Sequence, residues 1–151
     1  MRLLQNFGFG LIVAVALMAG CKKSPSTPPI TGAMGTEAVE ILNAISASDA
    51  VFADVGSTLI NEKADKYAGV DAALSPDYDT QTVVVVSLGQ VTTGGYGVKI
   101  TGAQRKGNHL FVQFTTSQPG PDDVVTQAIE HPYAAILIPK FTGTVHLEPQ
   151  D

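Results

Sequence analysis

The sequence predicts a mainly β domain of the α+β class, with one or two short helices and an antiparallel β-sandwich or small barrel. The run Val83–Val86 is β-branched throughout, which is typical of a strand buried on both faces. Apolar residues recur at every second position over Val98–Thr101 and again over Leu110–Thr115, as in strands with one buried face. Turn residues separate these short runs, so we expect a sandwich, with an immunoglobulin-like arrangement as one form of it.

Residues 1–20 have the features of a signal peptide, since Arg2 gives a positive start and the apolar segment Phe7–Leu17 is too short to span a bilayer. Cys21, the only cysteine, follows two small residues and resembles the modified cysteine of the bacterial lipobox. The resemblance implies a lipoprotein that carries diacylglycerol and an N-linked acyl chain, such as palmitate, on Cys21. Because Lys22 stands where aspartate would retain the protein at the inner membrane, we expect a lipid-anchored protein of the bacterial outer membrane.

The segment after the signal peptide is predicted to be a linker. Residues 21–35 are rich in proline, serine and threonine and show no apolar periodicity. Such a segment favours an extended chain of roughly 3 Å per residue, which would hold a domain away from the lipid surface.

Two short helices are expected after the linker. One is predicted over residues 36–48, because four apolar residues follow the i, i+3, i+4, i+7 spacing of an amphipathic helix. These four residues are Ala38, Ile41, Leu42 and Ile45. A shorter helix is expected to have Asn61 as its N-cap and to stop at Gly69, with a strand over residues 57–60 between the two helices.

The second half of the sequence is expected to supply most of the strands. The two alternating segments should pair as a hairpin, because Arg105–Asn108 between them has the composition of a tight turn. Residues 134–138 and 144–147 follow as two more strands, separated by proline and glycine. We therefore expect a single β-rich domain over residues 36–151, which is large enough to bury a core of its own.

Composition excludes several classes of partner. Nine Lys and Arg stand against fourteen Asp and Glu in the 151 residues, which gives a net charge of −5. Residues 1–20 hold one of the basic residues and no acid, so the rest of the chain carries −6. An acidic chain without a basic cluster is not expected to bind nucleic acid. A single cysteine allows no internal disulfide, so the fold must depend on its hydrophobic core.

Catalytic and metal-binding motifs are missing from the sequence. The histidines lack the local pairing of a zinc site; they are His109, His131 and His146. There is no Gly-x-Ser-x-Gly motif, and acylation of Cys21 would leave no free thiol. The acidic pairs Asp77/Asp79 and Asp122/Asp123 fall in loop-like segments, where solvated carboxylates are common. We therefore expect no catalytic residue, no metal and no cofactor, and a protein that is not an enzyme.

Four motifs of the second half occur in a specific order and spacing. They are Val83–Ile100, Gln118–Pro121, Val125–Ala128 and His131–Lys140. Together they resemble the C-terminal domain of the protease complex subunit PrcB family, over about residues 80–140. The family is named for a lipoprotein subunit that accompanies a secreted subtilisin-like protease. The resemblance therefore implies a non-catalytic subunit that binds another exported protein, with a protease as the candidate partner.

Three of these motifs include segments predicted to be loops, and these loops are candidates for a partner-binding surface at one end of the sandwich. Tyr96 and Tyr133 are expected to be its anchors, since exposed aromatic residues dominate such interfaces. The candidate residues are Thr93, Gly94, Gly95, Tyr96, Pro119, Pro121, His131, Pro132 and Tyr133. The alternative interpretation is structural, because glycine and proline at strand junctions commonly serve tight turns.

The same loops are faintly similar to those of chagasin-like inhibitors, which are immunoglobulin-like domains that block papain-like proteases. Thr92–Tyr96 is similar to their Thr-Thr-Gly-aromatic loop but has an additional glycine. His131–Tyr133 stands where that family has an Arg-Pro-Trp-like loop. This resemblance implies a protease inhibitor that acts through three loops, which is the alternative to an accessory binding subunit.

Overall fold

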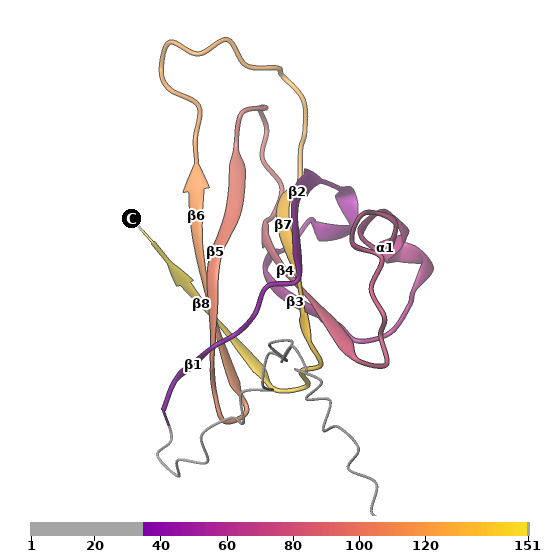
Figure 1. The fold of residues 1–151 in the computed structure, drawn as a ribbon. Coiled ribbons are helices and arrows are strands. Elements are labelled where there is room, and N and C mark those ends of the chain that lie inside the picture. The colour runs from indigo at the N-terminus through magenta and orange to yellow at the C-terminus, as the bar shows by residue number, and fades with distance from the viewer. Residues whose placement is uncertain (1–34, 151) are drawn as a thin grey trace, which may run out of the picture. The chain divides into compact units, whose positions relative to one another are not determined.

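The computed structural model describes residues 35–150. The predicted signal peptide, the candidate lipid attachment site Cys21 and all of the linker except Gly35 lie outside the described residues. Within the described part, eight strands form two sheets, ordered β1-β5-β6-β8 and β2-β7-β4-β3 (Figure 1). The strands are β1 (Glu37–Ala38), β2 (Asn43–Ser48), β3 (Val55–Ile60), β4 (Gln81–Leu88), β5 (Gly97–Lys106), β6 (His109–Ser117), β7 (Pro132–Pro139) and β8 (Thr144–Pro149). The helical segments are the 3-10 turns η1 (Ala50–Phe52) and η2 (Asp65–Tyr67) and the α-helix α1 (Ala68–Leu74).

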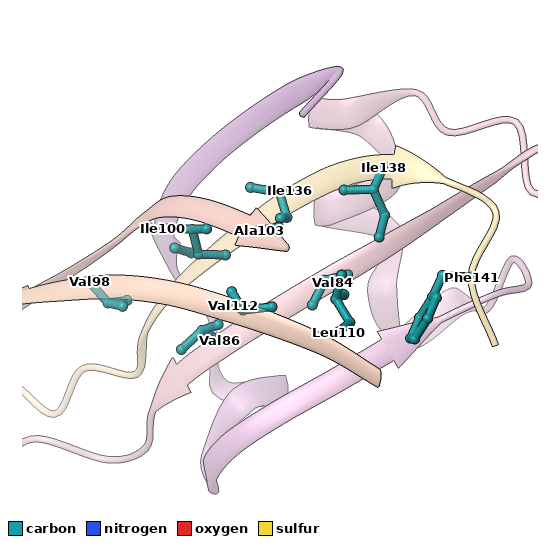
Figure 2. Close-up of a cluster of buried hydrophobic side chains, with 11 residues drawn as sticks. Val84, Val86, Val98, Ile100, Ala103, Leu110, Val112, Ile136, Ile138 and Phe141 are labelled. Atoms are coloured by element: carbon teal, nitrogen blue, oxygen red, sulfur yellow. The ribbon is translucent and has the colours of Figure 1, made fainter. Parts of the chain in front are cut away.

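The sheet β2-β7-β4-β3 is the central layer of the fold. On one side it packs against the sheet β1-β5-β6-β8 around a core that includes Val84, Val86 and Ile136 (Figure 2). On its other side, η1, η2 and α1 cover a second core that includes Val83 and Val85. The prediction of a sandwich is therefore confirmed, and the two sheets do not close into a barrel. Val83–Val86 is buried on both faces, as the β-branched run predicts.

The predicted hairpin is confirmed, whereas the prediction that all strands pair antiparallel is wrong for one pair. β5 and β6 pair from Gly97 and Ser117 down to Lys106 and His109, and Gly107 takes a positive φ of 59° in the turn. The last strand, β8, pairs with β6 in parallel, so this sheet is mixed and not purely antiparallel. The parallel pair arises because β7 lies in the other sheet, so the chain reverses direction there before β8 returns alongside β6.

The helix predicted over residues 36–48 is wrong. The segment forms β1, which pairs with β5, and β2, which pairs with β7. Between these strands the Leu42 N–H donates to the carbonyl oxygen of Leu137 at 2.8 Å. The segment crosses from one sheet to the other. Ile41 therefore packs against the core between the sheets, and Ile45 packs against the second core, which α1 covers. The apolar spacing thus reflects two sheet faces and not one helical face.

The shorter helix lies later in the chain than predicted. α1 follows η2 directly, so Asn61 is not its N-cap, and Gly69 lies in its first turn instead of at its end. The helix ends at Ser75, which takes the left-handed conformation with a φ of 50°. Its position follows from Val70 and Leu74, which are four residues apart and both buried against the central sheet.

Candidate functional site

Two long connections meet at the same end of the sandwich. Residues 89–96 join β4 to β5, and residues 118–131 join β6 to β7 (Figure 1). They lie side by side because Gly97, which follows the first connection, pairs with Ser117, which precedes the second. These two connections are called the loop end below. The tight turn between β5 and β6 lies at the opposite end of the domain.

Backbone hydrogen bonds join the two connections of the loop end. Val91 and Glu130 donate to each other's carbonyl oxygens, at 2.9 and 3.0 Å, and the Gly94 N–H donates to the Thr126 carbonyl oxygen at 2.9 Å. A Cβ at Gly94 would collide with Thr126 Oγ1, and Gly95 has a left-handed φ of 91°. Gly94 and Gly95, two of the predicted site residues, therefore shape the backbone of the loop end, which forms one connected surface.

The exposed side chains of the loop end include apolar and acidic ones beside neutral polar ones. Val124 is fully exposed and Ile129 is 63% exposed. Asp122, Asp123 and Glu130 supply carboxylates, and neither connection contains a lysine or arginine. The loop end therefore combines negative charge with two apolar side chains in solvent, a pairing that suits a protein surface of opposite charge.

Four further predicted residues lie on the loop end. Tyr96 is half-buried and borders a shallow pocket of about 220 Å³ between the ends of the two sheets. Thr93 is half-buried on the same connection. Pro119 and Pro121 flank a turn in which the Gly120 N–H donates to the Asp123 carboxylate at 2.7 Å. This turn precedes Val124, so the prolines and the carboxylate fix the path of the chain that exposes it. The lining residues of the pocket are Leu88, Val91, Tyr96, Thr116, Ser117 and Gln118.

The third predicted loop does not contribute an exposed anchor. Pro132 and Tyr133 begin β7 and are buried, and the Tyr133 side chain is only 4% exposed. Its ring lies 4.5 Å from that of Phe52, between centroids. Burial, and secondarily the Asp49 carboxylate, raises the pKa of Tyr133 above its ordinary value. The expectation that Tyr133 is an exposed anchor is therefore wrong, and of this motif only His131, which is half-buried, lies on the loop end.

A polar cluster beside α1 has a structural role. The Tyr78 hydroxyl donates to Asp71 Oδ1, and Lys140 Nζ donates to the Tyr78 carbonyl oxygen at 2.6 Å and to the Asn61 carbonyl oxygen at 3.1 Å. Burial and then the hydrogen bond to Asp71 raise the pKa of Tyr78, so the phenol stays protonated. The cluster joins α1 to the segment before β4 and to the end of β7.

Two residue sets escaped the sequence analysis. Val124 and Ile129 stand in a segment rich in proline and acidic residues without strand periodicity. Large apolar residues outside any predicted strand are the sequence signal that could have identified them. His109 and His146 are adjacent in the structure, although no local spacing relates them. Over residues 35–150, no three or more His, Cys, Asp or Glu side chains gather as metal ligands would. The helices in this part of the chain are too short or too polar to cross a bilayer.

The fold and its loop end define a two-sheet β-sandwich domain whose candidate binding surface is built from the connections between the sheets. Residues 82–139 match the family model described as PrcB C-terminal, which confirms the predicted resemblance over this segment. The matched segment runs from β4 to the end of β7 and includes the whole loop end. No curated protein and no solved structure matches the chain.

Proposed function

We propose that this protein is a lipid-anchored, non-catalytic subunit of an exported complex, and that its loop end binds a protease. The observation that carries the proposal is the acidic and apolar loop end, held as one surface by hydrogen bonds between its two connections. A surface that is already ordered loses little conformational entropy when it binds. Val124 and Ile129 are the apolar contacts, and the carboxylates select a partner with a basic rim.

The position of the loop end is consistent with a tether. Glu37 of β1 pairs with Arg105 of β5, close to the β5–β6 turn. The loop end adjoins Gly97, which lies at the other end of β5 (Figure 1). Eight residues of strand span roughly 25 Å, so residue 37 and the loop end lie at opposite ends of the sandwich. A tether that joins the domain before Glu37 therefore enters it at the end opposite the loop end.

The choice of partner rests on the family. The PrcB family is associated with a protease complex, and the matched segment includes the loop end. The non-catalytic role rests on the sequence, which lacks a recognisable nucleophile motif. The alternative function, a protease inhibitor that acts through three loops, has less support. Pro132 and Tyr133 of its third loop are buried at the start of β7.

Site-directed photocrosslinking in native cells tests the proposal. A photoreactive phenylalanine analogue is placed at Val124 or at Ile129, and a control analogue at Lys106, an exposed residue beside the opposite turn. The expected result is one crosslinked protease from both loop-end positions and none from Lys106. The double charge reversal Asp122→Lys, Asp123→Lys should weaken this crosslink at unchanged protein level. Equal crosslinking from Lys106, or a crosslinked protein without protease activity, would contradict the proposal.

A further inference from the structure

Two histidines from different strands meet on the outer face of the sheet β1-β5-β6-β8. His109 Nδ1 of β6 and His146 Nε2 of β8 are 2.9 Å apart, although the residues are separated by 37 positions in the chain. Both side chains are exposed. The two imidazoles are therefore held next to each other where solvent and small ions have access.

The parallel pairing of β6 and β8 brings the two rings together. Phe111 is the register partner of His146, and His109 precedes Phe111 by two residues on the same face of the sheet. The Phe111 ring stacks on the His146 ring, with centroids 4.9 Å apart and planes 17° apart. This stacking limits the orientations of the His146 ring and keeps it beside His109.

The separation of the two nitrogens suits a metal ion that binds both. Two metal–nitrogen bonds of about 2.0 to 2.1 Å that meet at about 90° place their nitrogens about 2.9 Å apart. A right angle belongs to the tetragonal and octahedral coordination of Cu²⁺ and Ni²⁺, whereas a tetrahedral site separates its nitrogens further, by about 3.3 Å. Rotation of the two exposed rings away from their hydrogen-bonded orientation would turn both lone pairs toward one ion.

We propose that His109 and His146 form a two-imidazole site for a divalent transition metal of the Cu²⁺ or Ni²⁺ type, with water in the other coordination positions. In the free pair one ring donates its N–H to the other. On binding, that ring changes to its other tautomer, because its N–H proton moves through water to its second nitrogen, and both facing nitrogens then become ligands. The site lies near the β5–β6 turn and shares no residue with the loop end.

The test uses the full chain, purified in detergent with an affinity tag that contains no histidine. Calorimetric titration with Ni²⁺ in a non-coordinating buffer compares the wild type with His109→Gln and His146→Gln, and His131→Gln is the matched control. We expect one site per chain, a loss of affinity of about tenfold or more in either paired variant, and no change in the control. Wild-type affinity for Ni²⁺ in both paired variants, or an equal loss of Ni²⁺ affinity in His131→Gln, would overturn the proposal.

A second readout reports the ligands directly. The electron paramagnetic resonance spectrum of bound Cu²⁺ should show two equivalent imidazole nitrogens in the wild type and one in each paired variant. Because His109 and His146 are exposed, the two paired variants should keep the thermal midpoint of the wild type. A wild-type spectrum without two imidazole nitrogens would exclude the site even if the protein bound metal elsewhere.

Discussion

Tyr133 of β7 packs against Phe52 of η1, with ring centroids 4.5 Å apart and ring planes inclined by 46°. The Phe52 carbonyl oxygen also accepts a hydrogen bond of 2.6 Å from the buried Ser87 hydroxyl of β4. One aromatic contact and one buried hydrogen bond thus fix η1 to two strands of the central sheet. A tyrosine from a predicted binding motif is part of the core.

The two motif tyrosines should respond differently to truncation. Tyr133→Ala is expected to lower the free energy of unfolding by about 3 to 5 kcal/mol, because it leaves a cavity beside Phe52. Tyr96→Ala, at a half-buried position, should cost about 1 kcal/mol. Urea unfolding followed by circular dichroism measures both values. A Tyr96 variant less stable than the Tyr133 variant would contradict the assignment of Tyr133 to the core.

The stability of the domain should depend on glycine at position 94, because one side chain lies close to it. Gly94→Ala is expected to destabilise the domain by about 1 to 3 kcal/mol, because the new Cβ collides with Thr126 Oγ1. The same change should increase amide hydrogen exchange in residues 118–131. Thr126→Ala removes the opposing hydroxyl, so the double variant Gly94→Ala, Thr126→Ala should recover part of the loss. Strictly additive effects in this double-mutant cycle would show that the collision is not the cause.

Stability should fall in alkaline solution. The pKa values of Tyr78 and Tyr133 are raised in the folded state, so above about pH 10 these tyrosines keep protons that the unfolded chain loses. The folded state then binds more protons, and the free energy of unfolding decreases as pH rises. Tyr78→Phe removes one of these groups and should reduce the slope between about pH 10 and 11. Equal slopes for wild type and variant, measured by urea unfolding at each pH, would contradict the raised pKa of Tyr78.

Membrane attachment should depend on Cys21. Cys21→Ser removes the thiol that would carry the lipid, so the protein should move from the membrane pellet to the soluble fraction of lysed cells. Ser24→Ala, three residues further along the predicted linker, is the control and should stay in the pellet. Mass spectrometry of the wild-type N-terminal peptide should show the added acyl mass. A Cys21→Ser variant that remains tightly bound to membranes would refute the lipid anchor.

Elements with a local signal were predictable. The run Val83–Val86 indicates burial on both faces by composition alone, and Arg105–Asn108 indicates a turn between two alternating segments. Gly95 and the prolines of the loop end were also found from sequence, because their conformations are local properties. For these residues the nearest neighbours in the chain provide most of the constraint on the backbone conformation.

Elements that depend on distant partners were not predictable. Residues 36–48 contain apolar residues at helical spacing, but hydrogen bonds to β5 and β7 make the segment two strands. Tyr133 lies in a motif that indicates a loop, and only its packing against Phe52 shows that it is buried. Propensity is a weak local preference, so a pair of sheet edges that can accept hydrogen bonds overrides it.

The sequence by itself determined a mainly β domain, the hairpin, the buried central strand and the resemblance of residues 82–139 to the PrcB C-terminal family. Only the tertiary structure decided that β8 runs parallel to β6, which places His146 beside His109. It also decided which motif residues are exposed. The physical reason is that strand order and register depend on contacts between residues far apart in the chain, which no local periodicity encodes.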